Sequence, residues 1–210
     1  MKITFSNLFL NRFSGILESY YNTKYGGTGE LKYKARREFL MDVRNLILTK
    51  SFILEPNAKQ FTGNNDEKTL KILRFVKNMF VFVGDIENNK EIEYWENPEI
   101  TWQKEEGDCE DGALLIVSLM RMAGIPAWRV KICAGWVKDK LGNKYGHAYA
   151  IYLSEESNQW YVLDWCFYPE ISIKSFNNTP HKDLPYYLDI WWTFNDENAF
   201  PNQHSSVIEW

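Results

Sequence analysis

The feature that most constrains the fold is an almost wholly apolar run from Ala113 to Ala123, which ends at Gly124-Ile125-Pro126. A helix that is apolar on every side is buried on every side. Glycine commonly ends a helix, and Pro126 cannot continue one. The chain has 210 residues, of which 45% are hydrophobic, so it is long enough to bury such a helix in a sizeable core. The sequence therefore predicts a fold built around one central helix.

The segment just before this run reads Gly107-Asp108-Cys109-Glu110-Asp111-Gly112 and carries reactive chemistry. Cys109 lies at or just before the first turn of the helix, where Asp108 is a suitable N-cap. Backbone N–H groups at a helix N-terminus favour an anion, and the thiolate is the reactive form of cysteine. The carboxylates of Glu110 and Asp111 suit the helix dipole but oppose a thiolate by like-charge repulsion. A small buried hydrophobic residue rarely stands among acids, so we interpret Cys109 as a nucleophile.

Two later segments supply a histidine and an aspartate. Residues 145–153 and 160–165 are rich in aromatic and β-branched types, which predicts two strands joined by the polar loop 154–159. Antiparallel pairing of these strands brings His147 and Asp164 together on one face. The aspartate then orients the imidazole, as the third group of a catalytic triad does. A lone strand histidine is more often a core residue, but a buried aspartate needs a partner, and together with Cys109 the functional interpretation is preferred.

These motifs resemble a known family. From Tyr94 to Pro169, the block around Cys109, the Gly-Ile-Pro after the helix, the Gly-His-Ala strand and the following aspartate resemble the transglutaminase-like superfamily of the papain-like fold. The nearest resemblance is to the bacterial transglutaminase-like cysteine proteinases. The resemblance implies an α+β fold in which the nucleophile begins a helix packed on an antiparallel sheet. It also implies Cys109 as nucleophile, His147 as general base and Asp164 as its orienting partner.

The resemblance further implies residues that bind the substrate. Acyl transfer builds negative charge on the carbonyl oxygen, and the backbone N–H of Cys109 is one natural donor to it. Gln103 precedes Cys109 at the offset at which papain-like enzymes place an oxyanion glutamine, although a solvated loop residue is an equal alternative. Trp102 is similar to aromatic residues near transglutaminase sites, and Trp165 follows Asp164 directly. Both tryptophans are expected to bind substrate.

Two metals deserve consideration. Some of the similar proteinases bind calcium through acidic residues that flank the cysteine, which map to Asp108 and Glu110. Calcium takes six to eight oxygen ligands, so two carboxylates fit helix capping at least as well, and no cofactor is required by the triad. A zinc site that joins Cys109, Cys133, Cys166 and His147 is disfavoured because no close Cys-x-x-Cys pair is present. Cys133 and Cys166 are instead expected to face the core from strands, with Cys166 near Asp164.

We predict a single α+β domain over residues 1–210. It would comprise an N-terminal helical part over 1–93, a catalytic core over 94–169 and an aromatic C-terminal extension over 170–210. The extension is expected to serve the core or to wall a substrate cleft.

The N-terminal part carries the clearest helical patterns. Residues 30–48 place apolar side chains at a helical period, which predicts an amphipathic helix. A second helix is predicted over 67–82, with Asp66 as its cap. The glycine-rich segment 25–29 is interpreted as a turn, because it lacks the strand and the lysine of a phosphate-binding loop.

Composition narrows the partners and the compartment. The formal net charge of −4 and pI near 5.5 give no reason to expect nucleic acid. The N-terminal residues are too polar for a signal peptide, and no run is long enough to cross a membrane. A cytoplasmic protein is therefore expected, and because the similar proteinases are typically periplasmic, a phage-encoded or intracellular relative would account for the difference.

Three function classes remain open at this point. The leading one is thiol-dependent acyl transfer on a peptide or amide bond, ending in hydrolysis or transamidation. The alternatives are a non-catalytic peptide-binding or assembly module and a metal-dependent structural module. An intact set of Cys109, His147 and Asp164 favours the enzyme.

Overall fold

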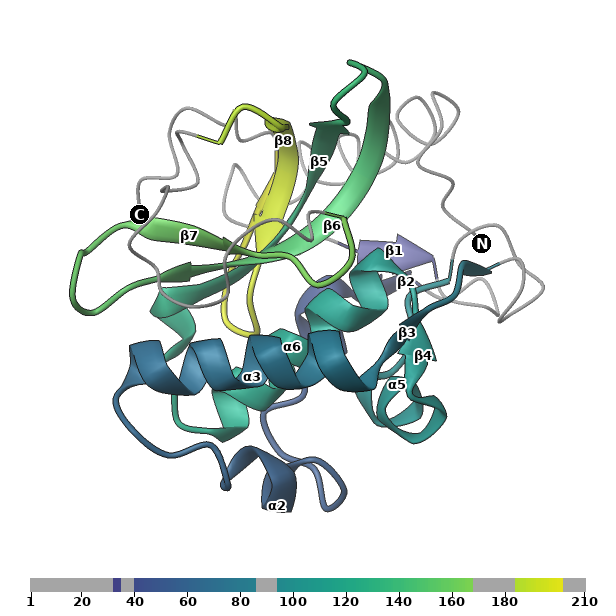
Figure 1. Ribbon diagram of the computed structural model, residues 1–210. Coiled ribbons are helices and arrows are strands. Elements are labelled where there is room, and N and C mark those ends of the chain that lie inside the picture. The colour runs from purple at the N-terminus through teal and green to yellow at the C-terminus, as the bar shows by residue number, and fades with distance from the viewer. Residues whose placement is uncertain (1–31, 35–39, 86–93, 168–183, 202–210) are drawn as a thin grey trace.

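The computed structural model describes residues 32–34, 40–85, 94–167 and 184–201 (Figure 1). Its helices are α2 (Glu55–Ala58), α3 (Asn65–Met79), α5 (Pro98–Lys104) and α6 (Cys109–Met122), with the 3-10 turns η1 (Val43–Leu46) and η2 (Ala127–Arg129). Its strands are β1 (Lys32–Lys34), β2 (Leu40–Asp42), β3 (Val81–Phe82), β4 (Glu106–Gly107), β5 (Val130–Lys138), β6 (Lys144–Leu153), β7 (Trp160–Leu163), β8 (Tyr187–Phe194) and β9 (Ala199–Pro201).

The main sheet has five strands in the order β7-β6-β5-β8-β9, and every neighbouring pair is antiparallel. One face of this sheet packs on α6, and α3, α2 and α5 contact α6 as well. The central helix is thus enclosed between the sheet and the other helices (Figure 1). This arrangement confirms the predicted α+β fold with a central helix on an antiparallel sheet. Strands β8 and β9 complete the sheet from beyond residue 170.

The central helix forms as the apolar run predicts. Every residue of α6 except Arg121 is buried. The helix ends where Gly124 adopts a φ of 86°, a left-handed conformation that glycine accepts without strain. The N–H of Ile125 then donates to the carbonyl of Met120 at 3.0 Å, which satisfies one of the last carbonyls of the helix.

The second predicted helix is present as α3, but its cap differs. The carboxamide of Asn64 accepts the N–H of Glu67 at 2.9 Å, so Asn64 and not Asp66 is the N-cap. Asp66 instead accepts the hydroxyls of Tyr152 at 2.6 Å and Ser154 at 2.8 Å. These bonds join the start of α3 to the hairpin of β6 and β7, which a local capping pattern cannot predict.

The helix predicted over residues 30–48 is wrong. The described part of this segment forms β1, β2 and η1, with β1 and β2 paired antiparallel. Asp42 accepts the N–H of Arg44 at 3.0 Å and starts a single 3-10 turn, which buries Val43 and Leu46. Apolar side chains of this segment are therefore buried from one short 3-10 turn and not from a long amphipathic helix. The glycine-rich segment 25–29 and the N-terminal residues lie outside the described residues.

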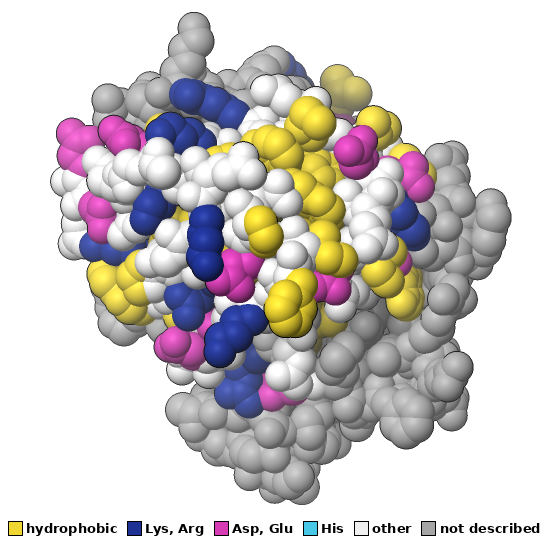
Figure 2. Space-filling view, turned by 90° about the horizontal axis from the view of Figure 1, so that it is seen from below, with side chains coloured by type: hydrophobic (Ala, Val, Ile, Leu, Met, Phe, Trp, Pro, Cys, Tyr) yellow, Lys and Arg dark blue, Asp and Glu magenta, His cyan; other side chains and the backbone are white. Residues whose placement is uncertain are grey.

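The surface of the helical layer carries basic, acidic and hydrophobic side chains together. On the face seen from below, Lys and Arg side chains alternate with Asp and Glu side chains and with hydrophobic ones (Figure 2). Within the described ranges, each helix is too short or too polar to cross a lipid bilayer.

Candidate active site

Cys109 is the first residue of α6, directly after the short strand β4. Its thiol donates to Oε2 of Glu110 at 3.0 Å, and both side chains are buried. Burial is the main reason that the pKa of the Cys109 thiol lies well above its ordinary value, and the carboxylates of Glu110 and Asp108 raise it further. The thiol is therefore protonated in this arrangement, even though a helix N-terminus favours the thiolate.

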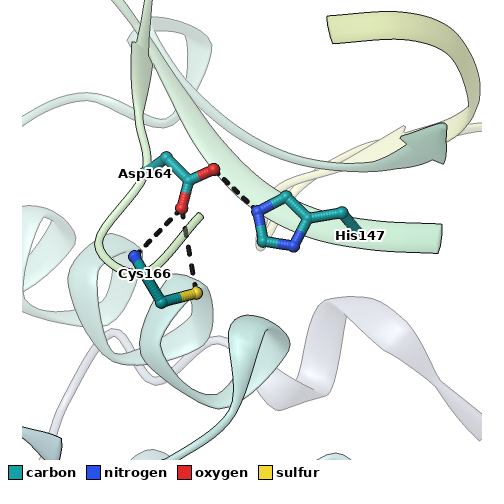
Figure 3. A group of neighbouring side chains, drawn as sticks. All are labelled: His147, Asp164 and Cys166. Carbon is teal, nitrogen blue, oxygen red and sulfur yellow. Dashed lines mark hydrogen bonds and ion pairs between the residues drawn. The ribbon is translucent and has the colours of Figure 1, made fainter. Parts of the chain in front are cut away.

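His147 lies on β6, and Asp164 follows the last residue of β7. The register of the two strands pairs Ala150 with Leu163, which sets the histidine opposite the end of β7. Nε2 of His147 lies 2.7 Å from Oδ2 of Asp164, and both side chains are almost fully buried (Figure 3). The hairpin thus brings these two residues together as predicted, while their catalytic roles stay predictions.

The carboxylate of Asp164 accepts further donors. The Tyr187 hydroxyl donates to Oδ2 at 2.8 Å, and the N–H groups of Cys166 and Phe167 both donate to Oδ1 at 3.1 Å. Burial alone would raise the pKa of Asp164, but the charge and hydrogen bond of His147, assisted by Phe167 and Tyr187, hold that pKa below its ordinary value. The aspartate is therefore an anion, and each of its oxygens accepts at least two hydrogen bonds.

Tyr187 is a site residue that the sequence did not reveal. It begins β8, which pairs with β5 and not with the hairpin that carries His147 and Asp164. Its ring also contacts Tyr149, at 4.7 Å between centroids. No local motif surrounds Tyr187, because its role depends on the position of β8 in the sheet.

The structure brings a second thiol to the same place. Sγ of Cys166 lies 3.9 Å from Oδ1 of Asp164, and one ligand atom each of His147, Asp164 and Cys166 lie within 4.8 Å of one another (Figure 3). Burial and the Asp164 carboxylate raise the pKa of Cys166 well above its ordinary value. Cys133 is buried against Tyr149 in a separate hydrophobic cluster, where burial raises its pKa to about 12. The groups of possible metal ligands found among the described residues do not include Cys133, so the zinc set does not assemble there.

The residues expected to bind substrate have different surroundings. Gln103 is exposed on α5. The ring of Trp102 stacks on Phe75, with 5.4 Å between centroids, so it belongs to the packing between α5 and α3. Trp165 is buried and lies so close to Gly112 in α6 that a Cβ there would be 2.0 Å from its Nε1. Trp165 therefore joins the end of β7 to the first turn of the central helix.

Acidic side chains gather at the start of α6. One carboxylate oxygen each of Asp85, Asp108 and Asp111 lie within 4.8 Å of one another, and the same holds for the ligand atoms of Asp108, Cys109 and Glu110. Oδ1 of Asp108 is buried and accepts no hydrogen bond from the described residues. Burial and the neighbouring carboxylates raise the pKa of Asp108 well above its ordinary value, and burial raises that of Asp111 to about 7. Asp85 and Asp111 thus add to Asp108 and Glu110, the two calcium ligands named from sequence.

Two comparisons with known proteins bear on this geometry. A family model described as the transglutaminase-like superfamily matches residues 56–165. Among solved structures, Legionella pneumophila LapG in an EGTA-treated form is 17% identical, with a TM-score of 0.50 over 73% of this chain and 86% of that chain. Its calcium-bound form is 17% identical, with a TM-score of 0.49 over 70% and 85%. No curated protein matches significantly.

The similarity to LapG concerns the fold, since the identity is low. The family match rests on sequence and covers more than half of the chain. It extends from α2 to Trp165, and it includes the cysteine that begins α6 and the buried pair of His147 and Asp164. The chain belongs to the transglutaminase-like superfamily.

Proposed function

We propose that this protein is a thiol-dependent acyl-transfer enzyme that acts on peptide or amide bonds of a protein or peptide substrate. Cys109 is the nucleophile, His147 the general base and Asp164 the residue that orients His147. The observation that supports this proposal best is the buried 2.7 Å contact between His147 and Asp164, in a superfamily member whose Cys109 begins the central helix.

The roles of the two imidazole nitrogens of His147 follow from which of them contacts Asp164. Nε2 of His147 contacts Asp164, so Nδ1 is the nitrogen that accepts the thiol proton. Sγ of Cys109 attacks the carbonyl carbon and forms a C–S bond. The imidazolium then protonates the leaving amine as the C–N bond breaks, which leaves a thioester. Water or a second amine, deprotonated by His147, attacks the thioester and releases the thiol, so that the outcome is hydrolysis or transamidation.

The oxyanion of this reaction needs donors. Cys109 is the first helical residue, so its backbone N–H has no acceptor within the helix and can donate to the oxyanion. We propose Gln103 as the second donor, which requires its exposed side chain to turn from the surface of α5 toward the substrate. Trp165 is proposed to contact the substrate, and Trp102 to support α5 through its stacking on Phe75.

The carboxylates around Cys109 fit a cation. Asp85, Asp108 and Asp111 can each offer an oxygen at one place, and the buried Oδ1 of Asp108 accepts no hydrogen bond from the described residues. Carboxylate oxygens are the ligands that calcium prefers. We propose that these three residues, with Glu110 beside them, hold calcium. A bound calcium ion would neutralise the charge that raises the pKa of the Cys109 thiol.

Cys166 is the alternative nucleophile, because it lies with His147 and Asp164 in one group. Against it, its sulfur contacts the Asp164 carboxylate, and none of the helices within the described residues begins at Cys166. The remaining alternative, a non-catalytic peptide-binding or assembly module, does not account for the buried contact between His147 and Asp164.

Mapping of the reactive thiol tests the proposal. Brief iodoacetamide treatment at pH 7 with calcium present should label Cys109 before Cys133 and Cys166, because its thiol lies at the N-terminus of α6. Cleavage or amine labelling of a peptide library should cease in Cys109→Ala and His147→Ala, whereas Cys133→Ala should retain activity. Faster labelling of Cys166, with activity lost in Cys166→Ala but kept in Cys109→Ala, would reassign the nucleophile.

A further inference from the structure

Strand β3 borders the segment that leads into the nucleophile. It pairs in parallel with β4, with Phe82 opposite Gly107. The N–H of Val81 donates to the carbonyl of Glu105, and that of Val83 to Gly107, both at 2.9 Å. Gly107 precedes Cys109 by only two residues, so β3 runs beside the start of α6.

The residues on and before β3 are exposed although they are apolar. Met79 at the end of α3, Val81 and Phe82 are 48%, 63% and 57% exposed. Three large apolar side chains are thus exposed within four positions, interrupted by the buried Phe80, and Phe82 is the one that contacts Trp165. We call Met79, Val81 and Phe82 the β3 surface.

The β3 surface also contacts the segment that follows strand β7 and carries Asp164. The ring of Phe82 contacts that of Trp165, with 6.2 Å between centroids. Trp165 follows Asp164 and packs on Gly112 in the first turn of α6. Phe82 therefore lies next to both segments that carry the proposed catalytic residues.

The backbone of β3 offers hydrogen bonds as well. Val81 and Val83 direct their N–H groups toward β4, so by the alternation of a strand the N–H and C=O of Phe82 point to the opposite edge. Among the described residues, β4 is the only strand paired with β3. An extended peptide can add to such an edge, with its main chain giving affinity and its side chains giving specificity.

We propose that the peptide substrate binds as an added strand along the open edge of β3 and places a large apolar side chain against Phe82. This inference rests on the proposed function and specifies its substrate class: a peptide in extended conformation with an aromatic or large aliphatic residue near the scissile carbonyl. Phe82 is then a specificity-determining residue and takes no part in the bond-breaking steps.

Peptide binding without chemistry tests the inference directly. In the Cys109→Ala protein, calorimetry is used with capped tetrapeptides: one of four alanines, and others with a single Phe at each position in turn. At one position Phe should improve affinity by roughly tenfold, since an aromatic ring leaves water. Adding Phe82→Ala should abolish that gain, and Phe82→Leu should restore part of it. Trp128→Ala, which removes another exposed aromatic side chain, is the matched control.

Two further arms separate strand addition from mere apolar contact and from the proposed chemistry. N-methylation of the peptide at the residue paired with Phe82 should weaken binding by roughly tenfold, because one main-chain donor is lost. Iodoacetamide labelling of Cys109 in the Phe82→Ala protein should match the wild type. Equal affinity for Phe and Ala peptides, or a Phe gain that survives Phe82→Ala, overturns the inference. Failure of Cys109 to label overturns the proposed function alone.

Discussion

We propose that the first turn of α6 and the hairpin of β6 and β7 contribute to one site, and of these two regions only the hairpin has its charges balanced. On the hairpin, the Asp164 carboxylate accepts His147, Tyr187 and two backbone N–H groups, and its pKa is lowered. On the helix, Asp108, Glu110 and Asp111 crowd Cys109, and the pKa values of Asp108, Cys109 and Asp111 are raised. The proposed base, His147, is thus already positioned, whereas the proposed nucleophile, Cys109, needs the charge around it neutralised.

This difference teaches where regulation of the site can act. A preorganised pair such as His147 and Asp164 is brought into position when the protein folds, so the free-energy cost of ordering it is part of folding. A cluster of buried carboxylates must instead bind protons or a cation, so its state depends on pH and on metal. Thiol reactivity in this protein should therefore respond to conditions through α6 and not through the hairpin.

Replacement of Asp164 by asparagine should cause a smaller loss of activity than Cys109→Ala or His147→Ala, but still a large one. The amide can still accept the two backbone N–H groups, but its NH2 faces Nε2 of His147 and favours the tautomer with a proton on Nδ1. That tautomer cannot accept the thiol proton, so turnover of a peptide library should fall by roughly 10³- to 10⁴-fold with the melting temperature near that of the wild type. Asp164→Ala should unfold more easily, because five donors lose their acceptor. An active Asp164→Asn would show that Asp164 is structural.

A methyl group at Gly112 tests how tightly the two parts of the site are joined. An alanine in a helix interior usually stabilises relative to glycine. Here the Cβ would lie 2.0 Å from Nε1 of Trp165, so Gly112→Ala should lower the free energy of unfolding by about 3 kcal/mol in denaturant titrations. Gly84→Ala is the control, since nothing lies within 4 Å of its Cβ. An unchanged Gly112→Ala would mean that Trp165 can move away from α6.

Removal of the Glu110 charge should increase the reactivity of the Cys109 thiol. The Glu110 carboxylate accepts a hydrogen bond from the Cys109 thiol, and it would repel the thiolate of that residue. In the presence of a chelator at pH 7, Glu110→Gln should therefore raise the rate of Cys109 alkylation by about tenfold, the effect of lowering a thiol pKa by one unit. Glu156→Gln, at an exposed position of the hairpin loop, should leave the rate unchanged. A slower rate in Glu110→Gln would assign Glu110 a supporting role toward Cys109.

The pH dependence of stability tests the buried carboxylates at the start of α6. Because the pKa of Asp111 is raised to about 7 when folded, the folded protein binds a proton between about pH 4 and 7 that the unfolded chain releases. With a chelator present, the free energy of unfolding should thus fall as pH rises through that window, by about 4 kcal/mol for a pKa difference of about three. Asp111→Asn should flatten this dependence in thermal melts.

The same melts test the proposed ion. Added calcium should raise the melting temperature, and the gain should grow with pH as the carboxylates ionise, because a ligand of the folded state stabilises it by mass action. Magnesium at equal concentration is the comparison. A gain that is absent, or equal for both ions, would rule against a calcium site at Asp85, Asp108 and Asp111.

The sequence by itself determined the parts of this protein that depend on neighbours along the chain. The apolar run and its Gly-Ile-Pro end specify α6, the acidic block places Cys109 at its first turn, and the two aromatic segments with a polar loop specify the hairpin that joins His147 to Asp164. Each follows from local propensity, from a period, or from a turn that allows one pairing.

Only the tertiary structure decided what distant segments bring to the site. Tyr187 reaches Asp164 through the place of β8 in the sheet, and Asp85 joins Asp108 and Asp111 across the turn after β3. The helix predicted over residues 30–48 failed for the same reason, since burial of Val43 and Leu46 against the core outweighed a helical period. Contacts between residues far apart in sequence leave no periodic or spacing signal along the chain, so they become visible only when the elements pack.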